Sequence, residues 1–65
     1  MTKEEIVAKY GHLINNTGGN DPLELVKRLE EPRLMSTNVV VFTLAVAVEG
    51  QIALLQRLDK EGLLA

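Results

Sequence analysis

The stretch Val-Val-Val-Phe-Thr-Leu-Ala-Val-Ala-Val occupies residues 39 to 48, and Thr43 is its only polar residue. The chain has 65 residues, and a domain of this size buries only about 60% of the surface that its unfolded chain exposes. Such a small domain has little room to cover so apolar a segment on every side. The sequence therefore predicts that something else, most simply a second copy of the chain, covers part of it.

The residues that follow continue the pattern of this segment. Apolar residues recur at helical spacing, and at about 100° per residue they fall on one face; they are Val41, Leu44, Val48, Ile52, Leu55 and Leu58. Gly62 and Leu63 then resemble a helix end of the Schellman type. We expect one long helix over residues 39–61, with Ser36, Thr37 and Asn38 as alternative N-caps.

The same stretch has a second interpretation as a β-hairpin over residues 39–58, which would make the fold α+β. Large residues alternate with smaller ones between Phe42 and Val48, and Glu49 with Gly50 could form the turn. The second arm weakens this alternative, because residues 52–61 contain adjacent leucines and strong helix formers.

The amino-terminal residues predict a first short helix over residues 3–14. Thr2 and Glu5 have the spacing of a capping box, in which each side chain satisfies a backbone N–H at the start of the helix. Its apolar residues form one inward stripe at helical spacing, and they are Ile6, Tyr10, Leu13 and Ile14.

A second short helix is predicted over residues 22–31, after a loop of Asn, Thr and Gly at residues 15–20. Asp21 is its N-cap and Pro22 its first residue. Pro32 ends it, because proline disfavours the α conformation of the preceding residue. Leu25, Val26 and Leu29 should point inward. The predicted fold is thus all-α, one domain over residues 1–65, with both short helices packed on the long one in an oligomeric bundle.

The side of the long helix opposite its leucine-rich face is the predicted contact between copies. Small residues mixed with larger apolar ones allow a second helix to approach closely. The predicted oligomer interface comprises Phe42, Thr43, Val46, Ala47, Gly50 and Ala53. We expect a homodimer, because two-fold symmetry is the commonest closed arrangement.

Few residues suggest chemistry. The chain has no cysteine and one histidine, so it offers no recognisable nucleophile and base pair or three-ligand metal site. His12 near a helix carboxyl end is explained more simply as a dipole partner or a solvated side chain. Gly18 and Gly19 lack the lysine and the hydroxyl residue of a phosphate-binding loop. We expect no catalytic, cofactor-binding or metal-binding residue.

Two other partners have some support in the sequence. Residues 55–64, Leu-Gln-Arg-Leu-Asp-Lys-Glu-Gly-Leu-Leu, resemble the end of the recognition helix of winged-helix DNA-binding proteins, but no wing strands follow and only Arg57 and Lys60 could reach phosphate. Nucleic acid is therefore disfavoured. A membrane span needs about 20 apolar residues, and Glu49, Gly50 and Gln51 interrupt the apolar run that begins at Val39. A membrane partner is therefore disfavoured as well.

The acidic balance of the chain also disfavours nucleic acid as a partner. The net charge is −2, and the chain contains no run of basic residues. It begins with Met-Thr-Lys-Glu-Glu rather than the basic and then apolar start of a secretory signal. We expect a cytoplasmic, self-associating helical module without catalysis, such as an accessory subunit or an assembly factor that binds another protein. A small DNA-binding regulator and a membrane-associated protein are the alternatives.

Overall fold

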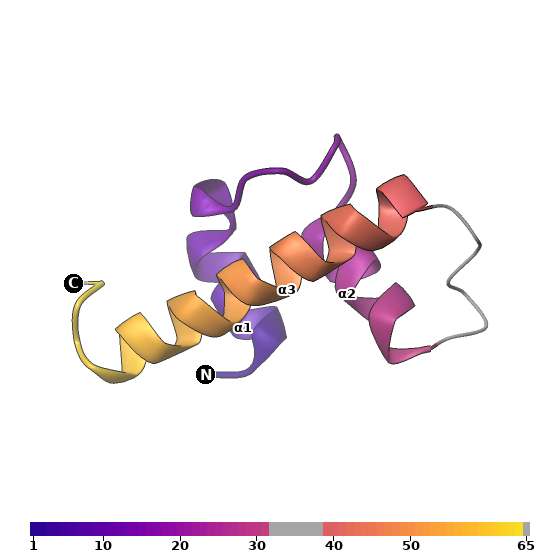
Figure 1. Cartoon of the computed structure of the whole chain (residues 1–65). Coiled ribbons are helices and arrows are strands. Elements are labelled where there is room, and N and C mark those ends of the chain that lie inside the picture. The colour runs from indigo at the N-terminus through magenta and orange to yellow at the C-terminus, as the bar shows by residue number, and fades with distance from the viewer. Residues whose placement is uncertain (32–38, 65) are drawn as a thin grey trace.

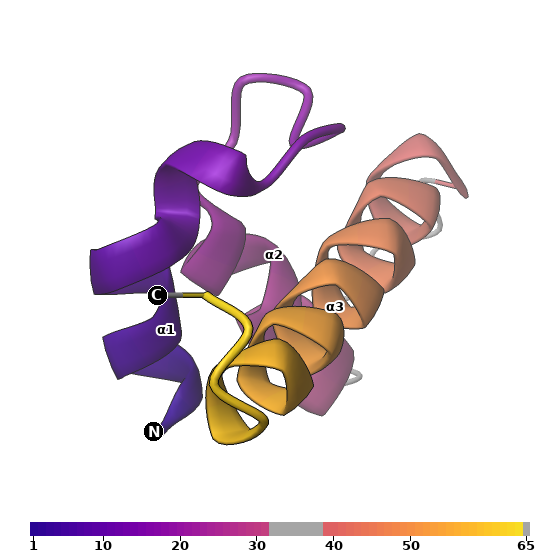
Figure 2. The ribbon, with the colours of Figure 1, turned by 90° about the vertical axis from the view of Figure 1, so that its left-hand side faces the viewer.

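A computed structural model describes residues 1–31 and 39–64. These contain α1 (Lys3–Tyr10), a 3-10 turn η1 (Gly11–Leu13), α2 (Pro22–Glu30) and α3 (Val39–Lys60). Figures 1 and 2 show α1 and α2 on one side of α3, which is the longest element. The predicted all-α arrangement is confirmed, and the hairpin alternative is wrong because residues 39–60 form one continuous helix. The predicted N-caps Ser36, Thr37 and Asn38 lie outside the described residues.

The first helix begins with the predicted capping box. The Thr2 hydroxyl oxygen accepts a hydrogen bond from the Glu5 backbone N–H at 3.2 Å, and the Thr2 backbone N–H donates to the Glu5 carboxylate at 3.0 Å. This second bond lowers the pKa of the Glu5 carboxyl group below its ordinary value, because it stabilises the charged form. Two of the backbone N–H groups that lack a partner within the helix, those of Thr2 and Glu5, are thereby satisfied.

The regular part of this first helix ends at Tyr10, four residues before the predicted end. Residues 11–13 wind more tightly as a 3-10 turn, which has about 3.0 residues per turn instead of about 3.6. The tighter winding rotates the following side chains relative to the stripe. Ile14 is buried as predicted, but Leu13 is 47% exposed, so its predicted place on the inward stripe is wrong.

The ends of the other helices follow local rules. The Asp21 carboxylate accepts a hydrogen bond from the Leu23 backbone N–H at 2.8 Å, and Glu31 is extended, as expected before proline. At the end of α3, the Leu63 N–H donates to the Leu58 carbonyl and the Gly62 N–H to the Asp59 carbonyl. This pair of bonds is the predicted Schellman arrangement.

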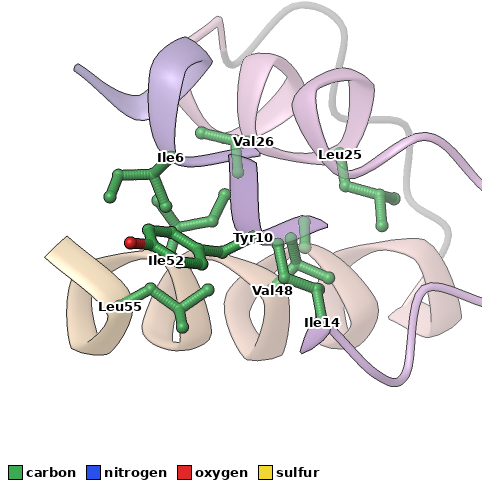
Figure 3. Close-up of a cluster of buried hydrophobic side chains, with 9 residues drawn as sticks. Ile6, Tyr10, Ile14, Leu25, Val26, Val48, Ile52 and Leu55 are labelled. Carbon is green, nitrogen blue, oxygen red and sulfur yellow. The ribbon is translucent and has the colours of Figure 1, made fainter. Parts of the chain in front are cut away.

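The core lies where α1 and α2 meet the inner face of α3 (Figure 3). Its buried residues are Ile6, Tyr10, Ile14, Leu25, Val26, Ala45, Val48, Ile52 and Leu55. The predicted leucine-rich face of α3 is therefore confirmed as the inner one, with Val41, Leu44 and Leu58 partly buried at its edges. Ala45 was not predicted there, yet it is completely buried.

Candidate functional site

The outer side of α3 carries a continuous apolar surface. We call it the exposed α3 face, and it consists of Val39, Phe42, Thr43, Val46, Gly50, Ala53 and Leu54. Phe42, Val46 and Leu54 are each about half exposed, at 48%, 49% and 56%. Because the core residues Val48 and Ile52 project from the opposite side of the helix, α3 is apolar on both sides and covered on one.

The only hydroxyl group on this face is already satisfied within the helix. The Thr43 hydroxyl donates a hydrogen bond to the Val39 carbonyl oxygen one turn earlier, at 2.9 Å. The face therefore presents no unpaired hydroxyl donor to whatever packs against it. Its other members carry aliphatic or aromatic side chains, apart from Gly50.

Gly50 lies in the middle of the exposed α3 face, at a position where the folded chain has no need of glycine. A Cβ atom added there would meet nothing within 4 Å, and the residue is part of the regular helix. Glycine inside a helix costs about 1 kcal/mol relative to alanine. The isolated chain thus carries an unfavourable residue at a point where its own packing would accept a side chain.

A shallow groove of about 550 Å³ runs beside this part of the helix. Leu29 of α2 and Val46, Gly50 and Ala53 of α3 line it. Charged side chains form its rim, namely Lys3, Glu30 and Glu49, and the Lys3 ammonium pairs with the Glu30 carboxylate at 3.1 Å. The groove therefore has an apolar floor and a polar edge, which is the usual composition of a protein contact site.

The structure brings five of the six predicted interface residues together on the exposed α3 face. The sixth, Ala47, is half-buried and lies at the edge of that face. Sequence reasoning missed Val39 and Leu54, although helical periodicity could have found them, since Val39 is seven residues before Val46. Leu29 could not have been found in this way, because it reaches the groove from another helix.

The length and composition of α3 would also allow it to cross a membrane. Its most apolar window has a mean hydropathy of 1.9, and 22% of that window is buried inside the protein. The core helix of a soluble protein meets the same two criteria. In this chain Ala45, Val48, Ile52 and Leu55 of α3 are buried against the other helices.

Of the residues considered above for chemistry or phosphate binding, His12 lies away from this surface, whereas Arg57 is seven residues after Gly50 and so lies on the same side of α3. His12 is exposed in η1. Within residues 1–31 and 39–64 there is no group of three His, Cys, Asp or Glu residues that could hold a metal ion. Arg57 lies 3.7 Å from the Glu61 carboxylate, so one of the two cations proposed to reach phosphate has an acidic neighbour.

A second hollow, of about 600 Å³, lies between residues 9–13 and residues 63–64. It is lined by Lys9, Tyr10, His12, Leu13, Leu63 and Leu64. Leu13 is exposed to nearly the same extent as Val46, at 47% against 49%. Leu13 thus provides a matched comparison for experiments on the exposed α3 face.

Comparison with known proteins gives no relative on which to base a function: no protein-family model, curated protein or solved structure matches the chain.

Proposed function

We propose that this protein is a small interaction module that self-associates through the exposed α3 face, with a two-fold homodimer as its basic unit. The observation that carries the proposal is the apolar surface of α3 opposite the core, on which Phe42, Val46 and Leu54 are about half exposed and Val39 is 73% exposed. Contiguous apolar residues exposed on a protein surface often mark a contact site for another protein. A second copy removes this surface from water without any change in the fold.

The contacts that hold α3 to the rest of the chain favour a protein partner over a lipid one. The Gln51 side chain forms two hydrogen bonds with the backbone of Asn15, and α3 supplies four of the nine core residues. To span a membrane, α3 would have to give up these contacts and place Glu49 and Gln51 in the hydrocarbon, where polar groups are costly.

The proposed role is structural rather than catalytic. The groove beside the exposed α3 face offers Lys3, Glu30 and Glu49 as its charged side chains, and Lys3 and Glu30 are paired with each other. Such a site suits recognition of another polypeptide, as in a cytoplasmic accessory subunit or an assembly factor. Acidic neighbours beside Lys3 and Arg57 make a nucleic-acid partner less favourable, because phosphate contacts need unpaired cations.

Substitution of Val46 by glutamate tests the proposal. An unpaired carboxylate buried at the contact costs several kcal/mol, and each 1.4 kcal/mol is a factor of about ten in affinity. We expect Val46→Glu to shift the dimer dissociation constant, measured by analytical ultracentrifugation over a range of concentrations, by about 100-fold or more. The helix content in circular dichroism should stay unchanged, because Val46 is half exposed in the folded chain.

Leu13→Glu is the control, because it places the same charge at an equally exposed position away from the exposed α3 face. It should leave the dissociation constant within about twofold of that of the unsubstituted protein, as surface substitutions usually do. A monomer mass for the unsubstituted protein at high micromolar concentration would contradict the proposal. So would co-sedimentation with phosphatidylcholine vesicles that Val46→Glu abolishes, because lipid would then be the occupant of the face.

A further inference from the structure

Four residues of the exposed α3 face are spaced equally on the two sides of Val46. The two before it have larger side chains than the two after it. Seven and four residues before Val46 stand Val39 and Phe42, and four and seven residues after it stand Gly50 and Ala53. Positions four and seven apart lie on one side of a helix. Of these four residues, the two before Val46 are large and the two at the matching positions after it are small, whereas Thr43 and Leu54 lie toward one edge of the face.

From this pattern we propose that two copies pack α3 against α3 in antiparallel orientation about a two-fold axis at Val46, with Phe42 of each copy in the groove at Gly50 of the other. The inference rests on the proposed self-association and adds its geometry. A two-fold axis at Val46 places residue 42 opposite residue 50 and residue 39 opposite residue 53. Phe42 then meets Gly50 and Val39 meets Ala53, so a large side chain lies opposite a small one in both pairs, which allows the two helices to pack closely.

The groove supplies the space for the ring of Phe42. Its volume is about 550 Å³, and Leu29, Val46, Gly50 and Ala53 provide its apolar lining. A side chain at Gly50 would occupy this space, although nothing in the same chain would oppose it. The unfavourable glycine in the middle of α3 is thus explained by the second copy, which needs the socket.

The charges on α3 favour the antiparallel orientation. In a parallel pair, Glu49 and Arg57 would each lie beside their own counterparts in the other copy, and like charges repel. In the antiparallel pair about Val46, the two Glu49 residues are displaced by about 9 Å along the axis and the two Arg57 residues by about 33 Å. The segment that enters the groove, residues 39–48, contains no charge that could conflict with Glu30 or Glu49.

Mixing two complementary variants tests this geometry. Phe42→Ala leaves the groove of the opposite copy empty, and Gly50→Leu fills it, so each variant alone should associate at least about tenfold more weakly than the unsubstituted protein. In an equimolar mixture, the new leucine faces the new alanine while the remaining Phe42 faces the remaining Gly50. The mixed dimer should therefore recover most of the lost affinity. The control is Ala8→Leu, at an exposed position on α1. It should not weaken association by itself, and mixing it with Phe42→Ala or with Gly50→Leu should not restore their affinity.

Disulfide trapping gives an independent measurement, because the chain has no cysteine of its own and a disulfide requires Cα atoms within about 7 Å. Val46→Cys should cross-link to itself on oxidation. Ala53→Cys alone should not cross-link, whereas a mixture of Val39→Cys with Ala53→Cys should give the mixed dimer.

The outcomes separate this geometry from the self-association on which it rests. Self-cross-linking of Ala53→Cys in a dimeric protein, or failure of the complementary variants to recover affinity, would overturn the antiparallel pairing and leave self-association standing. A monomeric unsubstituted protein at every concentration would overturn both.

Discussion

At the scale of single residues, Gly18 beside α3 and Gly50 within it differ in whether the folded chain favours a glycine at that position. Gly18 has φ of +62°, and a Cβ atom there would lie 2.7 Å from the Leu44 Cδ1 atom. The backbone conformation and the close approach of the Leu44 side chain therefore both favour a residue without a side chain at this position. Gly50 is required by neither within its own chain.

Substitution of Gly18 by alanine should destabilise the fold more than the same change at Gly19. A left-handed conformation costs a non-glycine residue about 1 to 2 kcal/mol, and the clash with Leu44 adds about 1 kcal/mol or more. Gly19 has φ of +83° and open space around it, so Gly19→Ala should lose only the first of these contributions. Urea unfolding followed by circular dichroism measures both. Equal losses would show that Leu44 moves aside without cost.

At the scale of elements, the phase of α1 and η1 decides which side chains enter the core. The tightening at Gly11 turns Leu13 outward and leaves Ile14 buried. A uniform helix over residues 3–14 would have placed Leu13 and Ile6 on the same stripe, seven residues apart. The two residues thus look equivalent in the sequence and differ in the folded chain.

Alanine substitutions at these two positions measure that difference. Ile6→Ala removes a side chain that is fully buried, and such a change costs about 2 to 5 kcal/mol. Leu13→Ala should cost about 0.5 kcal/mol or less, because surface substitutions usually do. Thermal and urea unfolding of both variants provide the comparison. A loss of more than about 2 kcal/mol for Leu13→Ala would mean that the uniform helix exists in solution.

At the scale of the whole molecule, a few polar contacts between distant residues attach α3 to the rest of the chain. The Gln51 amide accepts from the Asn15 backbone N–H at 2.7 Å and donates to the Asn15 carbonyl at 2.6 Å. The Tyr10 hydroxyl lies 3.2 Å from both the Asp59 carboxylate and the Leu64 carbonyl, which accept its single proton. These contacts hold the loop and the carboxyl end of the chain against the bundle.

Replacing Gln51 by leucine should release the loop from α3. We expect a loss of about 1 to 2 kcal/mol, since the two hydrogen bonds to Asn15 disappear and each is worth about 1 kcal/mol. The longer bond of 3.4 Å to the Ala47 carbonyl within α3 is lost as well. The Asn15 amide should also exchange its hydrogen faster, which NMR measures directly. Gln56→Leu is the matched control, because Gln56 makes one bond of 3.2 Å to the Met1 carbonyl, and its loss should be smaller. Unchanged exchange at Asn15 would contradict the contact.

The sequence predicted the elements and the buried side of α3 well. The caps at Thr2 and Asp21 and the helix end at Gly62 were predicted correctly, because each depends on hydrogen bonds between residues within about one turn. The exposed α3 face was predicted for five of its seven members, because periodicity along one helix assigns side chains to faces. Ala45 was missed because alanine occurs readily on either face of a helix.

What the sequence could not supply were the contacts between segments far apart in the chain. The approach of Gly18 to Leu44, the bonds of Gln51 to Asn15 and the place of Leu29 beside Gly50 link residues 21 or more positions apart. These depend on how the helices cross and on where η1 rotates the chain. Local hydrogen bonding and periodicity leave both open, because they act within an element, whereas packing between elements determines which of their surfaces meet.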